Sequence, residues 1–303
     1  MDLQSKIILI SGPTASGKSS FAIRLAKLIK GEIINADSMQ VYKELKILTA
    51  RPNLTKKNKI KHHLYGFLTI KKSFSTGQWL KLASNKIKEI KKRNKVPILV
   101  GGTGLYFKAL TEGLVKIPKI SKKKRKIVLN LQKKIGQINF YKKLTIIDPK
   151  IRKIVNSNDL QRSIRAYEVK KFTRKSLFDW YKDTKSLFNK DDFVKIYIDC
   201  PRDVLLKRIK IRTQKMFKGA VTEVKKIKNM KIPNTNSSNK IIGINAIKDL
   251  LEKKRNKQQT IDLIVIKTRQ YAKRQATWAR GQMKDWKSIP IPDKNFSLKK
   301  IIY

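Results

Sequence analysis

Eight residues near the amino terminus constrain the fold of this chain more than any other segment. Gly12–Ser19 reads GPTASGKS and fits the spacing G-x-x-x-x-G-K-[ST] without adjustment. The apolar run Lys6–Ile10 precedes this segment, and a stretch of helical periodicity, Phe21–Ile29, follows it. A strand, a glycine-bounded loop and a helix in this order are the setting in which such a loop binds phosphate. The sequence therefore predicts a P-loop within an α/β fold.

Each part of the loop has a physical role in binding an anion. Gly12 and Gly17 allow the backbone to curl so that successive N–H groups face inward. Lys18 adds a positive charge, and the start of the helix adds the positive end of its dipole. The Ser19 hydroxyl can hold Mg²⁺. The loop predicts a diphosphate or triphosphate ligand, without indicating which reaction the ligand undergoes.

Strands and helices alternate through the first third of the chain. Strands are predicted at Glu32–Asn35 and Val96–Val100, with an amphipathic helix at Gln78–Lys92 between them. This alternation favours a parallel sheet that is covered on both faces. Ligands of such sheets bind beyond the carboxyl ends of the strands. We therefore expect the P-loop, Asp37 and Thr103 to converge on one crevice.

The character of the sequence changes near Lys116. From there to about Asn189 only helical periodicity and charge are evident, and strand character returns at Val194–Cys200. We predict a P-loop NTPase-like parallel sheet core, residues 1–116 and 193–303, interrupted by an all-helical insertion domain, residues 117–192. The remaining predicted elements are helices at Leu205–Lys228, Asn245–Lys254 and about Thr260–Gln282, and a flexible loop at Asn234–Asn239.

The formal net charge of +52 is extreme, and it has two explanations. A basic protein of this kind can bind a polyanion such as nucleic acid. The lysines are nevertheless spread along the whole chain, which also fits a bias in coding composition. No apolar run approaches the roughly 18 residues of a membrane span. The only cysteine, Cys200, excludes a disulfide framework, and we expect a cytoplasmic protein without a membrane partner.

Two polar clusters raise the question of catalysis or metal binding. Asp37 follows a predicted strand, where its carboxylate could bind Mg²⁺, act as a general base, or cap a turn together with Ser38. The residue types do not separate these three roles. His62 and His63 are adjacent and therefore diverge, and no third ligand is evident, so we do not expect a metal site there.

Five segments occur in an order that resembles the tRNA dimethylallyltransferase family, and the likeness extends from about Ile7 to Arg280. These segments are Gly12–Ser19, Asp37–Tyr42, Gly101–Tyr106, Asp159–Val169 and Thr268–Trp278. Two features depart from the usual pattern. Tyr65 and Gly66 follow His62–Leu64 where the family often has an apolar residue and Asp, and Gly243–Ala246 reads GINA in place of Gly-Tyr-Arg/Lys-Gln. The second departure puts one expected RNA contact in doubt.

The resemblance implies a reaction and a set of residues for it. The family transfers a dimethylallyl group from dimethylallyl diphosphate to the exocyclic amine of the adenosine 3′ of the anticodon in tRNA, and releases diphosphate. Asp37 would accept the proton of the amine, Thr103 would orient the adenine, and Arg212 would lie near the diphosphate. Ser19 would help to hold the Mg²⁺ cofactor. The implied diphosphate-binding residues are Gly12, Pro13, Thr14, Ala15, Ser16, Gly17, Lys18 and Ser19.

The resemblance also implies contacts to the anticodon stem-loop of tRNA by a monomeric enzyme. The implied RNA-binding residues are Asp37, Ser38, Met39, Gln40, Thr103, Arg125, Gln161, Arg162, Ser163, Ile164, Arg165, Lys273, Arg274 and Gln275. Each has a simpler alternative. A basic run such as Lys122–Lys126 is commonly a solvated helix face, and charged and aromatic residues at helical spacing, as in the last helix, are commonly a solvated face over a core stripe.

Three other functions use similar parts. A small-molecule kinase would consume ATP, an isopentenyltransferase of free AMP or ATP would share the P-loop and the base, and an RNA-binding NTPase would need no transferase site. The helical insertion and the basic helix near the carboxyl terminus favour a macromolecular acceptor, so tRNA prenylation is the preferred interpretation.

Overall fold

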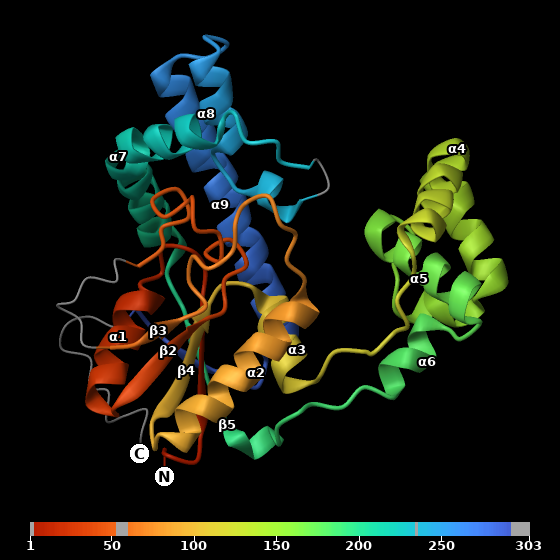
Figure 1. Cartoon of the computed structure of the whole chain (residues 1–303), viewed down its shortest axis with the longest axis horizontal. Coiled ribbons are helices and arrows are strands. Elements are labelled where there is room, and N and C mark those ends of the chain that lie inside the picture. Colours follow the sequence, from red (N-terminus) through yellow and green to blue (C-terminus); the bar gives the residue numbers. More distant parts are fainter. Residues whose placement is uncertain (1–2, 53–59, 234–235, 292–303) are drawn as a thin grey trace. The chain divides into compact units, whose positions relative to one another are not determined.

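The structure is a computed structural model that describes residues 3–52, 60–233 and 236–291 (Figure 1). The chain divides into two compact units. The first comprises Met1–Thr111 and Leu187–Tyr303, and the second comprises Glu112–Ser186. The division falls a few residues before each predicted boundary. The two connecting segments contact each other at Gly113, where an added Cβ would lie 2.3 Å from the carbonyl oxygen of Lys185, so both segments group with the second unit.

A six-stranded parallel sheet forms the centre of the first unit. Its order is β3-β2-β4-β1-β5-β6, and every pair of neighbouring strands is parallel. The strands are β1 (Ile7–Ser11), β2 (Gly31–Asn35), β3 (His62–His63), β4 (Val96–Gly101), β5 (Phe193–Ile198) and β6 (Lys287–Ile289). The predicted parallel sheet is confirmed. The edge strands β3 and β6 were not predicted, because two and three residues are too few to show a period.

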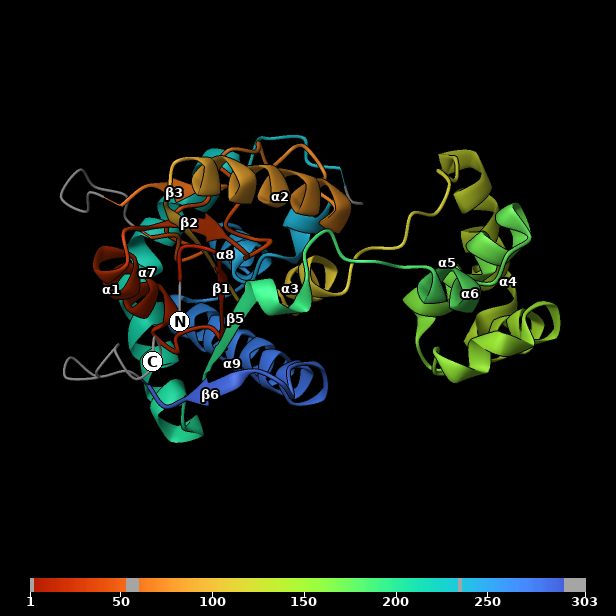
Figure 2. The same cartoon turned by 90° about the horizontal axis from the view of Figure 1, so that it is seen from below.

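Helices cover both faces of this sheet, because the side chains along each strand point alternately to one face and the other. The helices of the first unit are α1 (Lys18–Leu28), α2 (Thr76–Lys92), α3 (Gly104–Thr111), α7 (Arg202–Ile227), α8 (Ile244–Leu251) and α9 (Lys257–Gln282), with a short 3₁₀ helix, η2, at Lys190–Asp192. Figure 2 shows α1 and α2 on opposite faces of the sheet. Ile7 and Leu9 of β1 pack with α2 and α3, whereas Ile8 and Ile10 pack with α1. Successive side chains of a strand point to opposite faces, so one apolar run supplies both cores.

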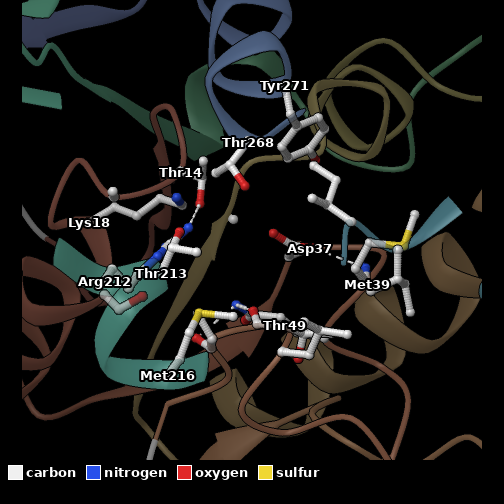
Figure 3. Close-up of a pocket in the computed structure, with 18 of the residues that line it drawn as sticks. Thr14, Lys18, Asp37, Met39, Thr49, Arg212, Thr213, Met216, Thr268 and Tyr271 are labelled. Atoms are coloured by element: carbon white, nitrogen blue, oxygen red, sulfur yellow. Dashed lines mark hydrogen bonds between the residues drawn. The ribbon is translucent and has the colours of Figure 1, made fainter. Parts of the chain in front are cut away.

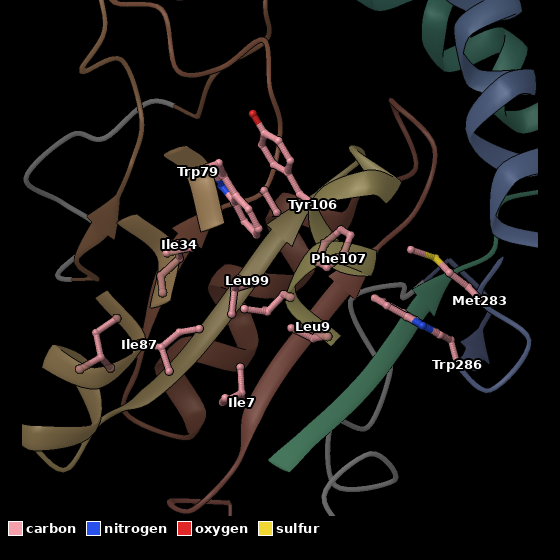
Figure 4. Close-up of a cluster of buried hydrophobic side chains, with 14 of the residues drawn as sticks. Ile7, Leu9, Ile34, Trp79, Ile87, Leu99, Tyr106, Phe107, Met283 and Trp286 are labelled. Atoms are coloured by element: carbon pink, nitrogen blue, oxygen red, sulfur yellow. The ribbon is translucent and has the colours of Figure 1, made fainter. Parts of the chain in front are cut away.

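Aromatic side chains organise the core beneath α2 and α3 (Figure 4). Trp79 and Tyr106 stack with their ring centroids 4.2 Å apart, and Phe107 meets Trp286 edge to face at 5.2 Å. The Trp79 indole Nε1–H donates to the carbonyl oxygen of Asn35 over 2.8 Å. This bond anchors the last residue of β2, the strand that leads into Asp37.

A separate apolar cluster joins α7, α8 and α9 to the segment that follows β2. Its members include Val41, Leu48, Phe217, Ile247 and Ile264. The three predicted helices of this region are confirmed to within a few residues at each end. Of the predicted loop Asn234–Asn239, the first two residues lie outside the described residues, and a 3₁₀ turn, η3, begins at Ser237 and ends at Lys240.

The second unit is built from helices. It contains α4 (Lys122–Ile147), η1 (Pro149–Lys153), α5 (Leu160–Thr173) and α6 (Leu177–Lys182). Gly136 interrupts α4 with φ 72° and ψ 171°, so the helix turns there. Apolar side chains such as Phe140, Leu144 and Tyr167 form its core. The buried Ser176 hydroxyl donates to the buried Asp148 carboxylate over 2.8 Å and ties α6 to the end of α4.

Among the described residues, no helix has both the length and the apolar character needed to cross a bilayer.

Candidate functional site

A cavity of about 620 Å³ lies at the carboxyl ends of the central strands (Figure 3). Its wall combines the loop after β1, the segment after β2, the end of β4, and side chains of α7 and α9. A volume of this size suits a small organic ligand. Residues that line the cavity include Thr14, Ala15, Gly17, Lys18, Ser19, Asp37, Met39, Gln40, Leu48, Tyr65, Arg208, Arg212, Met216, Lys240, Ile242, Ile264, Tyr271 and Arg274.

The loop between β1 and α1 packs closely against the strand ends. A Cβ on Gly12 would lie 2.9 Å from the carbonyl oxygen of Ile198 in β5, so only glycine fits there without movement. Gly17 adopts a left-handed conformation, with φ 93°, directly before α1. The Ser16 hydroxyl is buried without a hydrogen-bond partner among the described residues. These features give a tight loop that packs against the strand ends and contains one buried hydroxyl without a described partner.

Positive charge dominates the cavity. Five of its described lining residues are cationic, namely Lys18, Arg208, Arg212, Lys240 and Arg274, against the single carboxylate of Asp37. Burial lowers the pKa of Lys18 to about 8, although the nearby Asp37 carboxylate acts in the opposite direction. Burial also lowers the pKa of Arg212 from its ordinary value. Cations held out of water in this way favour an anionic ligand that would restore their solvation.

Arg212 is held over the loop by Thr14. Its Nη2 donates to Thr14 Oγ1 over 3.0 Å (Figure 3). The buried Nε of Arg212 has no hydrogen-bond partner among the described residues. One turn earlier on α7, Arg208 Nη1 donates to the carbonyl oxygen of Ser16 over 3.4 Å. The unused donors of Arg212 suit the oxygen atoms of a phosphate group.

Asp37 is fixed by the last residue of β2. Asn35 Oδ1 accepts from the Asp37 N–H over 2.9 Å, and Asn35 Nδ2 donates to the carbonyl oxygens of Asp37 and Leu64. Asp37 Oδ1 accepts from the Met39 N–H over 2.9 Å, so the carboxylate stabilises a turn, although no helix follows it. Figure 3 shows the carboxylate pointing into the cavity. A carboxylate in this place can accept a proton from a bound ligand.

The supporting role of Asn35 was missed in the sequence. The residue is fully buried, and its Oδ1, Nδ2 and backbone carbonyl oxygen each make a hydrogen bond to a neighbouring segment. The only available signal was an amide at the end of an apolar strand, which does not reveal its partners.

Thr103 lies next to the Asp37 segment, but its hydroxyl has structural partners. Its Oγ1 accepts from the Ser38 N–H over 2.9 Å and donates to Ser38 Oγ over 3.2 Å. The Thr103 N–H donates to the carbonyl oxygen of Ala36. Thr103 and Ser38 therefore brace each other, and neither is among the residues that line the cavity.

Apart from Ser38 and Thr103, the predicted RNA-binding residues of the first unit fall into three groups. Met39, Gln40 and Arg274 line the cavity together with Asp37. Lys273 is exposed on α9. Gln275 turns toward the protein interior, where its side-chain amide contacts the loops after β1 and β4.

In the second unit, Gln161 and Arg162 are exposed on the first turn of α5, and Arg125 is exposed on α4. Arg125 and Arg165 each lie 3.4 Å from the buried carboxylate of Glu168. The next two predicted contacts need correction, because the following residues of α5 rotate inward. Ser163 is fully buried and donates to the carbonyl oxygen of Asp159, and Ile164 belongs to the apolar core of the unit, so neither side chain can reach an RNA in this conformation.

The residues that could hold a metal are few. His63 pairs with Glu32 over 2.7 Å, and the described residues contain no group of three His, Cys, Asp or Glu side chains placed to hold an ion. Ser19 and Asp37 supply oxygen atoms to the wall of the same cavity. This donor set fits Mg²⁺, which keeps several waters and commonly takes further ligands from substrate phosphates.

Known proteins resemble this chain along nearly its whole length. It is 58% identical over 287 residues to a protein named tRNA dimethylallyltransferase from Pelagibacter ubique, an alignment that covers 94% of this chain and 92% of that protein. It is 45% identical over 284 residues to a protein of the same name from Rickettsia massiliae, with 93% and 78% of the two chains covered.

Solved structures of tRNA-modifying transferases also resemble this chain. A tRNA isopentenylpyrophosphate transferase from Bacillus halodurans matches with a TM-score of 0.70 and 32% identity, over 98% of this chain and 93% of that one. A eukaryotic dimethylallyltransferase acting on tRNA matches with a TM-score of 0.83 and 27% identity, over 98% and 77% of the two chains. The family model described as IPP transferase matches residues 40–282. The chain belongs to the IPP transferase family.

Proposed function

We propose that this protein is a tRNA dimethylallyltransferase. It transfers the dimethylallyl group of dimethylallyl diphosphate to the exocyclic amine of the adenosine 3′ of the anticodon, and releases diphosphate. The observation that carries the proposal is that the loop Gly12–Ser19 and the Asp37 carboxylate contribute to one cavity, which places an anion-binding loop and a base around a single ligand volume. Membership of the family supports the same reaction.

The donor occupies two chemically different parts of the cavity in this proposal. Gly12–Ser19 acts as a P-loop for the diphosphate, with Lys18 and Arg212 neutralising its charge. The apolar chain lies against side chains such as Met216, Ile242 and Ile264. When bound at Ser19, Mg²⁺ would offset the charge that builds on the departing diphosphate.

The transfer is a substitution at the allylic carbon. The exocyclic nitrogen attacks that carbon while its bond to the diphosphate oxygen breaks, and the electron pair of that bond leaves with the diphosphate. Asp37 accepts the proton that the nitrogen loses. Cationic side chains around the leaving group stabilise its developing charge, and apolar walls exclude water from the carbocation-like centre.

The acceptor must be a flexible part of an RNA, because a stacked adenine cannot enter the cavity without leaving its stack. We assign the helical unit, Glu112–Ser186, as the insertion domain that binds the anticodon stem-loop, with Arg125, Arg162 and Arg165 as its contacts. The buried state of the only cysteine, Cys200, is compatible with a reducing compartment, and we propose that the protein acts in the cytoplasm as a monomer.

The test offers labelled dimethylallyl diphosphate and Mg²⁺ to the purified protein, with unmodified tRNA and AMP as parallel acceptors. Label in tRNA alone is the expected result, whereas label in AMP would assign a nucleotide prenyltransferase. ATP hydrolysis without label transfer would contradict the proposal. Asp37→Asn should abolish transfer because the amide keeps the turn at Met39 but cannot accept the proton, and Asp191→Asn, an exposed carboxylate of the same unit, is the matched control.

A further inference from the structure

We propose that Gln275 is a positioning residue for the diphosphate donor, rather than an RNA contact. Its side-chain amide joins the loop after β1 to the loop after β4, and through Thr14 it holds Arg212 against the leaving group. This inference rests on the proposed function and assigns a role within the same site.

The geometry of the amide uses both of its ends. Gln275 Oε1 accepts from the Thr14 N–H over 2.9 Å, and Gln275 Nε2 donates to the carbonyl oxygen of Gly102 over 2.9 Å. These partners lie 261 and 173 residues away in the chain. Gly102 makes the approach possible, because a Cβ there would lie only 2.1 Å from Nε2. A side chain with one donor and one acceptor at this reach is therefore required, and glutamine supplies both.

The hydrogen bond from Thr14 to Gln275 determines which groups of Thr14 can bind an anion. Its N–H is occupied by Gln275, so it is not free to bind a phosphate oxygen. Its Oγ1 accepts from Arg212, which leaves the hydroxyl hydrogen free to point at an anion. The result is a continuous link from Gln275 through Thr14 to Arg212, a guanidinium whose Nε has no hydrogen-bond partner among the described residues.

The link begins on the helix that carries other predicted RNA contacts. Arg274 lines the cavity, and Lys273 is exposed beside it on α9. Tyr271, one turn earlier, also lines the cavity, and burial raises its pKa. Gln275 thus fixes the position of α9 relative to the diphosphate loop, so that the acceptor and the donor meet in a defined geometry.

Gln275→Met and Gln275→Glu test whether Gln275 positions the donor, once transfer to tRNA by the wild-type protein has been confirmed. Methionine keeps the length of the side chain and loses both hydrogen bonds. We expect kcat/KM for dimethylallyl diphosphate, measured at saturating tRNA, to fall roughly 10- to 100-fold, since small displacements of reacting groups have effects of this size. KM for tRNA should stay within about twofold of wild type. Gln270→Glu, an exposed position of the same helix, is the control and should change neither parameter.

The pH profile of Gln275→Glu separates positioning from a general structural defect. An ionised carboxylate has no proton to donate to Gly102, whereas the protonated carboxyl has one donor and one acceptor. Its donor kcat/KM, divided by the wild-type value at each pH, should therefore recover as the pH falls from about 8 to 5.5. The same ratio for Gln275→Met should stay flat.

Gly102→Ala provides an independent check, because the added methyl group would displace the amide. It should reduce the donor kcat/KM in the wild-type background and have a much smaller effect in Gln275→Met. A loss confined to KM for tRNA, a wild-type donor kcat/KM in Gln275→Met, or a flat ratio for Gln275→Glu would each overturn the inference. If wild-type protein transferred no label to tRNA, the proposed function would fail instead.

Discussion

Arg125 Nε lies 3.4 Å from Glu168 Oε1 and joins α4 to α5 within the helical unit. The two side chains differ greatly in exposure, at 63% for Arg125 and 1% for Glu168. Arg165 Nη1 approaches the other oxygen of the same carboxylate, also at 3.4 Å. A buried carboxylate therefore depends on two partly exposed guanidinium groups, most of whose N–H donors have no partner in the described part of the chain and could bind an outside anion.

This arrangement predicts how the helical unit responds to substitution. Arg125→Ala should lower the free energy of unfolding by about 1–3 kcal/mol, because it leaves the buried carboxylate with one partner. Glu168→Met should change it by less than about 1 kcal/mol, because apolar replacement removes the cost of burying the charge. The double variant should be more stable than Arg125→Ala alone. Urea unfolding monitored by circular dichroism measures all three, and a double variant less stable than Arg125→Ala would contradict this account.

The sequence predicted the parallel sheet and the loop before α1 because both depend on local signals, namely short apolar runs and a spaced glycine motif. It also placed Asp37 and the loop at the same edge of the sheet, since the topology of parallel strands requires it. It did not reveal that Gln275 faces Thr14 and Gly102, or that Ser163 and Ile164 face inward. Those orientations depend on tertiary packing between residues far apart in the chain, which no local period records.

We expect the titration of Lys18 to weaken donor binding at alkaline pH. Burial lowers its pKa to about 8, and its ammonium group must be charged to hold a diphosphate. Donor affinity that depends on this charge is therefore nearly complete well below pH 8 and is lost as the pH rises through that value. Donor kcat/KM measured from pH 6.5 to 9.5 at saturating tRNA should fall above about pH 8. Lys18→Ala should have a lower donor kcat/KM at every pH and should lack this fall. If the fall above pH 8 were unchanged in that variant, it would have to be assigned to another group.

We expect substitution of Asn35 to lower both stability and kcat, although its role is to support the Asp37 segment rather than to contact substrate. Asn35→Asp keeps the acceptor for the Asp37 N–H but directs a carboxylate at the carbonyl oxygens of Asp37 and Leu64. We expect a loss of roughly 1–3 kcal/mol in the free energy of unfolding, and a fall in kcat with little change in KM for tRNA. Asn94→Asp, placed in the exposed turn before β4, is the control. Full activity and stability in Asn35→Asp would show that the segment before Asp37 does not depend on this amide.

Arg212 and Arg208 lie one turn apart on α7 and predict different losses. Arg212→Lys removes the Nη2 bond to Thr14 Oγ1 and the Nε donor, which has no partner among the residues that the structure describes. An ammonium group cannot replace this forked geometry. We expect kcat for prenyl transfer to fall about 100-fold, the size found when one donor to a developing anion is removed. Arg208→Lys loses only a long bond to the carbonyl oxygen of Ser16 and keeps its charge at the cavity wall, so its loss should be smaller. Single-turnover transfer to tRNA compares the two directly. Equal losses would mean that the hydrogen bond between Arg212 and Thr14 gives Arg212 no larger part than Arg208 in stabilising the departing diphosphate.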